Sequence, residues 1–465
     1  MSAPRPTSIS LVHRIAAALA LAGAWLAVHA PLAGAAAGGG SSGFGGGGGG
    51  FSSGGSSGSF SSFSSGGGAS GSGNLGAGGA VVVAVVLLAV LVCLVLAAIQ
   101  AVRYRRRRRA RERRVELAAA EAAGDDAAFA PDAVRAEAER LFRAAQAAWD
   151  ARDEEALAQL LVPDLLTEWR RRLADFRRRG WHNRVEVLAV ERVEYLGLTN
   201  RDGHADDRVT VRIRARLRDY VVQRNGRILQ RRGASSTTVW LTEYWTLAKR
   251  PDGRGWVVAS IESDAEGRHV LEREIVATPW GDEARLRDAS LLEVAAIDKL
   301  PDGVATAEVA DLDYAGDAHA AALDLSLVDG RWAPQVLEAA LRRAVAAWAE
   351  AVDGADRDLL DVAAPEAARA LLHPGDLTGR TRLVIRGPRV RRLTIAALDS
   401  QAQPPTMTVE VEVEGRRYVE DRDSAAVLSG SKERPVVVTE RWTLALDGPD
   451  DRPWRIVATR APAPR

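Results

Sequence analysis

Residues 209–217 read Val-Thr-Val-Arg-Ile-Arg-Ala-Arg-Leu, a strict alternation of apolar side chains with arginine or threonine. Successive side chains of a β-strand point to opposite faces, so this stretch predicts a strand with one buried face and one solvated face. Such strands are typical of antiparallel sheets that carry helices on one face only. We therefore expect an α+β domain around this strand.

The sequence on both sides of this strand supplies the other elements of the domain. Apolar residues from Leu141 to Trp149 recur at helical spacing and predict a helix that faces the core. Asp153 precedes an acidic first turn, as at the start of a second helix. The expected order is three helices, ending near Trp149, at about 161 and at about Arg178, followed by strands near 185–189, 209–217, 236–248 and 256–260.

The same landmarks occur twice in the chain. Ala-Ala-Trp, a Tyr-Val pair, Glu-x-Trp-Thr-Leu and a final Trp-led strand recur in the same order, 197–199 residues apart. A period this long indicates two copies of a domain and not a solenoid, whose repeats run to about 20–50 residues. We place the copies at 131–263 and 334–462, joined by a connecting segment, 264–333. The paired aromatic residues are Trp149 with Trp348, Tyr220 with Tyr418, Trp245 with Trp442, and Trp256 with Trp454.

These motifs resemble the C-terminal domain of the forty-four-kilodalton subunit of the mitochondrial inner-membrane import translocase, the Tim44-like family. The likeness covers 131–263 well and 334–462 more weakly, since Arg417 stands where the first copy has Asp219. It implies a cone-shaped fold similar to nuclear transport factor two, with an apolar pocket between helices and sheet. It also implies membrane-surface attachment, lipid contact or protein scaffolding, and it brings no catalytic residues.

Residues 80–99 form an unbroken apolar run of 20 residues. About 20 apolar residues suffice to cross a bilayer as a helix, so we expect a transmembrane helix over 80–102. Nine arginines and one glutamate follow between Arg103 and Arg114, and this excess places the C-terminal side in the cytoplasm. The prediction is a single-pass protein of the inner (plasma) membrane with its N-terminus outside; the opposite topology is the alternative. In the basic segment, 103–130, the residues expected to contact anionic headgroups are Arg103, Arg105, Arg106, Arg107, Arg108 and Arg109.

Two further segments precede the apolar run. Residues 1–35 have a charged start, an apolar middle and a small-residue exit, which predicts a secretory signal peptide; an uncleaved signal anchor is the alternative. Residues 36–79 are almost wholly glycine and serine with interspersed phenylalanines, so we expect them to be disordered.

Two sets of residues in the copies are candidates for binding. The paired aromatics listed above either line a ligand pocket or fill the core, and their periodic spacing favours the core. The outward side chains of the long strand are basic in the first copy and acidic in the second. These rows are either neutralised on their own sheets or dock against each other, between domains or between two chains. The rows are Arg212, Arg214 and Arg216, and Glu410, Glu412 and Glu414.

The sequence contains few candidates for catalytic, metal-binding or phosphate-binding residues. The histidines outside the N-terminal region are isolated, the only cysteine is Cys93 inside the apolar run, and no phosphate-binding glycine loop is present. We predict no catalytic site, metal or cofactor. The net charge of +1 gives no reason to expect a nucleic acid partner. The expected function is a non-enzymatic, membrane-anchored binding or scaffold protein, with lipid as one ligand and an unidentified protein partner or a link to protein transport. The alternative is a small-molecule-binding or enzymatic domain that uses the cone pocket.

Overall fold

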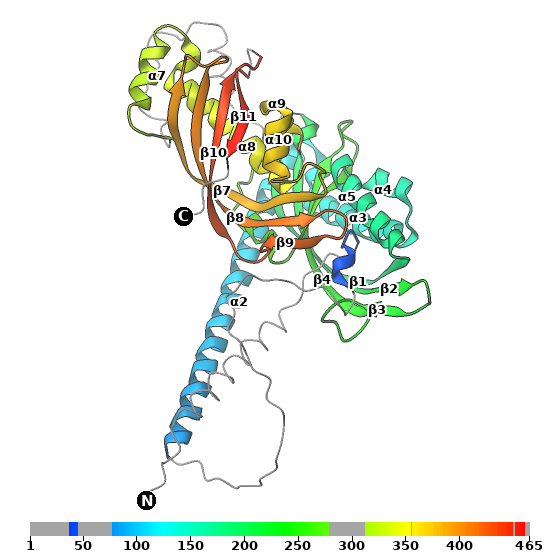
Figure 1. Cartoon of the computed structure of the whole chain (residues 1–465). Coiled ribbons are helices and arrows are strands. Elements are labelled where there is room, and N and C mark those ends of the chain that lie inside the picture. Colours follow the sequence, from blue (N-terminus) through cyan, green and yellow to red (C-terminus); the bar gives the residue numbers. More distant parts are fainter. Residues whose placement is uncertain are drawn as a thin grey trace, which may run out of the picture. The chain divides into compact units, whose positions relative to one another are not determined.

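The structure is a computed structural model that describes residues 37–44, 77–201, 203–278, 312–354, 356–449 and 452–460 (Figure 1). The expected signal peptide, most of the glycine/serine-rich segment and much of the connecting segment lie outside these residues. The chain divides into two units. One comprises Met1–Leu32 and Gly45–Arg109, and the other comprises Ala33–Phe44 and Ala110–Arg465.

Helix α2 (Ala77–Asp125) contains the apolar run. It is the one helix of the described residues that is long and apolar enough to cross a membrane. Its apolar side chains between Leu88 and Val102 are exposed, at 45–61% for the large ones. The C-terminal part of α2 belongs to the second unit, where Val115, Ala119 and Ala122 are fully buried in a hydrophobic core. The first domain therefore includes residues before 131, where we expected it to start.

The first domain consists of helices followed by an antiparallel sheet of order β1-β2-β4-β5, with β3 paired to the end of β2. Val209, Val211, Ile213, Ala215 and Leu217 are all buried in the core, which confirms the predicted buried face. On the other face Arg214 and Arg216 are exposed, whereas Thr210 and Arg212 are buried. The elements are η2 (Ala127–Phe129), α3 (Pro131–Ala151), α4 (Glu154–Leu160), α5 (Pro163–Arg178), β1 (Trp181–Thr199), η3 (His204–Asp206), β2 (Arg208–Gln223), β3 (Ile228–Gln230), β4 (Thr238–Lys249), β5 (Trp256–Ser263) and η4 (Glu266–Leu271).

The second domain has the same plan, with sheet order β11-β10-β8-β7-β6 and β9 paired to β8. Its extra strand, β6, is parallel to β7 and comes from the expected connecting segment, as does α7. The elements are β6 (Leu312–Tyr314), α7 (Ala318–Ser326), η6 (Gly330–Trp332), α8 (Pro334–Asp353), α9 (Arg357–Val362), α10 (Pro365–Leu372), β7 (Thr381–Asp399), β8 (Thr406–Asp421), β9 (Ala426–Gly430), β10 (Val436–Leu446) and β11 (Trp454–Arg460).

Local contacts repeat between the domains. The indole of Trp245 donates to Glu243 at 2.9 Å, and that of Trp442 donates to Glu440 at 3.1 Å. Strands β1 and β7 each have three register shifts against their neighbours, and such bulges bend a sheet. The predicted fold class, two tandem cone-like α+β domains behind a single apolar helix, is confirmed.

The interior of each cone is filled by side chains. Trp149, Trp245, Trp348 and Trp442 are completely buried, and their rings pack edge-on or tilted at centroid distances of 5.1–5.2 Å against other rings of the same core. Trp256, Trp454 and Tyr418 are also buried, and Tyr220 is half-buried. The structure therefore places the six tryptophans in the hydrophobic cores, whereas Tyr418 and Tyr220 lie outside both cores.

Candidate functional site

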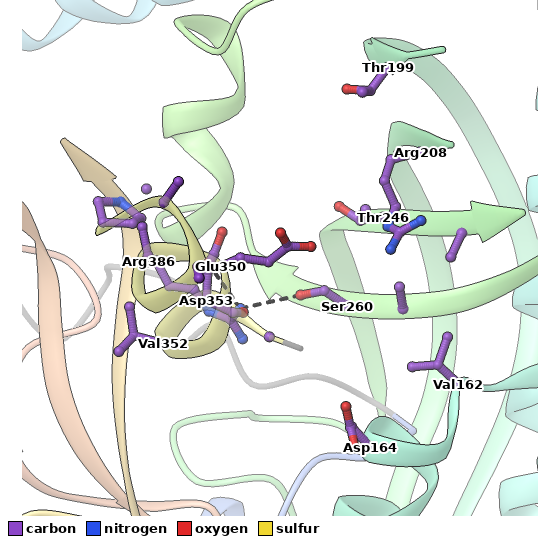
Figure 2. Close-up of a pocket in the computed structure, with 18 of the residues that line it drawn as sticks. Val162, Asp164, Thr199, Arg208, Thr246, Ser260, Glu350, Val352, Asp353 and Arg386 are labelled. Carbon is purple, nitrogen blue, oxygen red and sulfur yellow. Dashed lines mark hydrogen bonds and ion pairs between the residues drawn. The ribbon is translucent and has the colours of Figure 1, made fainter. Parts of the chain in front are cut away.

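A large cleft, of about 2280 Å³, lies between the two domains. Helix α5 and strand β5 of the first domain form one wall, and α8 and β7 of the second form the other. Figure 2 shows side chains of both walls, with Ser260 facing Arg386 at its centre. The Arg386 guanidinium donates to the Ser260 hydroxyl at 3.2 Å.

A buried ionic cluster joins the domains beside this cleft. The hydroxyl of Tyr418, on β8, donates to the Glu266 carboxylate of η4 at 2.7 Å, and Lys432 lies 3.9 Å from the same carboxylate. Burial alone would raise the pKa of Glu266, but Lys432 and Arg386 outweigh it and lower the pKa to about 2. Glu266 is therefore an anion at neutral pH, held by groups of the other domain.

Glu262, His269 and Asp353 each bring one potential metal-ligand atom within 4.8 Å of the others. His269 Nε2 lies 2.7 Å from Glu262, while Asp353 is bound by Arg273 at 2.6 Å and by Arg386. Two arginines on one carboxylate supply the positive charge that a cation would bring. The chemistry of this trio therefore fits an ionic contact between the domains better than a metal site.

Further ion pairs join α5 to the end of β8 and the β8–β9 turn. Arg171 bonds Asp423 at 2.8 Å, Arg172 bonds Glu420 at 2.8 Å, and Arg422 bonds Glu168 at 2.7 Å. The Arg172 and Glu420 side chains are 15% and 10% exposed, so this pair is little screened by solvent. The domains are thus held together by charge.

Residues 37–44 lie in a groove between the first domain and the β8–β9 turn of the second domain, although the sequence predicted disorder for this segment. Phe44 is 3% exposed and packs against Phe176, and Ser41 donates to Asp175. The short helix η1 (Ser41–Gly43) forms within the segment. In this structure these eight residues are ordered, because their backbone and Phe44 have partners on the domains.

The basic residues after the apolar run are placed in two ways. Arg103, Arg105, Arg106, Arg107 and Arg109 are exposed on α2, and Arg108 is half-buried beside Tyr104. The next arginine, Arg111, is 3% exposed and donates to the backbone carbonyls of Leu196 and Arg273 at 2.8 and 2.7 Å. Burial, with Arg114 and Arg273 nearby, lowers the pKa of Arg111 to about 10. Arg111 is therefore part of the first domain.

The two charged rows are engaged on their own sheets. Arg212 bonds Glu194 and Asp264 at 2.9 and 2.8 Å, while Arg214 and Arg216 lie over the ring of the exposed Trp240. In the second domain, Glu410 pairs with Arg441 and Glu414 with Arg391, and Glu412 is opposite Arg392 in the strand register. The domain contact described above uses other residues, and docking of the rows between two chains stays a prediction.

Comparisons with known proteins agree with part of this structure. Residues 115–263 match the family model of the Tim44-like domain. The first domain is Tim44-like. The match begins at Val115, the first core residue of α2, and ends at the last residue of β5.

Similar solved structures include the intermembrane space region of chloroplast protein ARC6, with 14% identity, a TM-score of 0.22, and coverage of 28% of this chain and 95% of that one. They also include an Ntf2-like protein involved in plasmid conjugation, with 9% identity, a TM-score of 0.16, and coverage of 68% and 93%. No curated protein matches.

Proposed function

We propose that the protein is a membrane-anchored binding module. Its two domains of Tim44-like fold are joined by ion pairs and act as one unit at the cytoplasmic membrane surface. The observation that carries this proposal is the distribution of exposure along α2. Large apolar side chains are exposed around the helix from Leu88 to Val102, and arginines are exposed from Arg103 to Arg109. Water is a poor solvent for the first set, and hydrocarbon is a poor solvent for the second.

A bilayer satisfies both sets at once. The hydrocarbon core covers the apolar stretch, and the arginines reach the headgroup layer, where each contributes about 1 kcal/mol with anionic lipid. Arg111 marks the end of the headgroup-facing set, because its charge is bound inside the domain. The positive-inside rule then assigns the domains to the cytoplasm.

Binding is favoured over catalysis by the character of the cleft. Several of the charged side chains that face it are engaged in ion pairs between the domains, as Arg172 is with Glu420 and Arg273 with Asp353. Groups held in this way position the domains and are not poised to transfer protons. A scaffold role, with a protein or lipid partner and no cofactor, is the function that this arrangement supports best.

The headgroup part of the proposal is tested with three exposed arginines. Replacing Arg105, Arg106 and Arg109 with glutamine should weaken the binding of a fragment that begins at Arg103 to anionic vesicles by about 3 kcal/mol, or roughly a hundredfold. The matched control replaces Arg224, Arg227 and Arg232, which are exposed on and beside the β2–β3 hairpin. Vesicle co-sedimentation at fixed salt measures both. An equal loss for the two triples would move lipid contact away from α2.

A further inference from the structure

The groove that holds residues 37–44 has the features of a peptide-binding site. Its walls supply hydrogen bonds to the backbone of the segment: Gln146 accepts from the Ala37 amide at 3.0 Å, Ser424 O accepts from the Ser42 amide at 3.2 Å, and the Arg232 amide donates to Gly43 O at 2.8 Å. Backbone bonds of this kind give affinity for a peptide in this conformation without regard to its side chains.

Specificity comes in part from the C-terminal end of the segment. Phe44 is buried beside Phe176, at a ring-centroid distance of 6.2 Å, with the Arg231 guanidinium 5.2 Å from its ring. Arg231 is itself fixed by the buried carboxylate of Asp219 at 2.8 Å. The groove therefore ends in an aromatic pocket with a cationic wall.

The glycines of the segment are selected by close contact. A Cβ at Gly38 would lie 2.3 Å from the Trp169 ring, and the φ of Gly38 is +74°. A Cβ at Gly40 would lie 1.7 Å from the backbone oxygen of Ser424, whereas one at Gly43 would meet nothing closer than 3.6 Å. The groove thus requires glycine at two positions and tolerates a larger residue at the third.

The position of these residues in the chain gives the groove its significance. Residues 37–44 precede the apolar run, and the domains follow it. A helix that crosses the membrane between them puts the segment and the groove on opposite sides. In the inserted protein the groove is then open to a different polypeptide.

We infer that this groove is a recognition site for a glycine-rich peptide of another protein on the domain side of the membrane, which adopts the turn and short helix of residues 37–44 and has the chemistry Gly-x-Gly-Ser-x-x-Phe. Residues 38–44 show how such a peptide is held. The inference rests on the membrane crossing in the proposed function, and the experiment below separates the failure of one from the failure of the other.

The experiment uses the full-length chain in sealed vesicles with the domains facing outward, and a fluorescent peptide of residues 36–45. Two receptors are compared, the natural chain and the chain with Gly40→Ala, whose own segment cannot dock. The peptide should bind both receptors saturably and with the same Kd. Peptides with Phe44→Ala should bind at least about tenfold more weakly, those with Gly40→Ala should show no measurable binding, and those with Gly43→Ala should bind like the natural peptide. Anisotropy measures binding, and matching tryptophan fluorescence melts show that both receptors are folded.

Each other result has one meaning. Absence of peptide binding to the Gly40→Ala chain, or equal binding of the Gly40→Ala and Gly43→Ala peptides, overturns the recognition site and leaves the membrane crossing untouched. Binding to the Gly40→Ala chain with weak or no binding to the natural chain means that the segment occupies its own groove. That result overturns the membrane crossing and, with it, the open groove.

Discussion

Glu266 and Glu272 both form ion pairs with the second domain, but their surroundings differ. Glu266 is 4% exposed and accepts from Tyr418, whereas the Glu272–Arg389 pair has side chains that are 48% and 55% exposed. Replacing each with glutamine keeps the size of the side chain and removes its charge. We expect the first change to weaken the domain contact strongly and the second to have little effect.

The magnitude follows from the pKa of Glu266. Its lowering from 4.5 to about 2 corresponds to about 3 kcal/mol of stabilisation of the folded anion. Glu266→Gln should therefore lower the free energy of unfolding by about 3 kcal/mol at pH 7, since Lys432 and Arg386 lose a buried counter-charge. Glu272→Gln should cost about 0–1 kcal/mol, as exposed pairs do.

The pH dependence supplies a second signature. Because the folded pKa of Glu266 is depressed, its contribution is fully present above about pH 4.5 and is lost as the pH falls toward about 2. The difference between the natural chain and Glu266→Gln should shrink across this window, while Glu272→Gln should track the natural chain throughout. Urea unfolding of the full chain in detergent, followed by tryptophan fluorescence at a series of pH values, measures both effects. Equal losses for the two variants, or a Glu266→Gln difference that does not change with pH, would refute the reasoning.

Two further predictions concern close contacts and charge. Gly387 and Gly316 have φ values of +59° and +58°, but a Cβ on Gly387 would lie 2.2 Å from His269, whereas Gly316 faces open space. Gly316→Ala should lower the free energy of unfolding by about 1 kcal/mol, and Gly387→Ala should lower it clearly more and increase hydrogen exchange at the domain contact. Equal losses would contradict the close contact between Gly387 and His269. If the charged rows dock between two chains, the protein should dimerise at low salt and separate into monomers as the salt concentration rises. Charge reversal at Arg214 and Arg216 should abolish the dimer, and additional charge reversal at Glu410 and Glu414 should restore it. A monomer at low salt would reject this docking.

Much of the fold follows from local patterns in the sequence. The strand over 209–217 and the helix ending near Trp149 each bury one face, so the spacing of their apolar residues predicts which side chains are buried. The repeated Trp-led motifs predicted the second domain for the same reason. The burial of Arg111 could not be predicted, because the sequence of a run of arginines does not indicate which of them is buried.

The contact between the domains could not be predicted. Glu266, Tyr418 and Lys432 come from separate parts of the chain, and each looks like an ordinary solvated or core residue in its own stretch. His269, Glu262 and Asp353 meet for the same reason only in three dimensions. The glycine/serine-rich segment shows a different limit. Its composition predicts disorder, and only the fit of Gly38, Gly40 and Phe44 to the groove reveals order.

Cysteine accessibility tests whether α2 crosses the membrane and leaves the domains on the cytoplasmic side. With Cys93 replaced by serine, single cysteines are introduced at Ser42, ahead of the apolar run, and at Arg227, exposed after β2. A membrane-impermeant maleimide is added to spheroplasts, whose plasma membrane is intact. Position 42 should be labelled at once, and position 227 should be labelled only after the membrane is permeabilised. Labelling of both positions from the same side would contradict this topology.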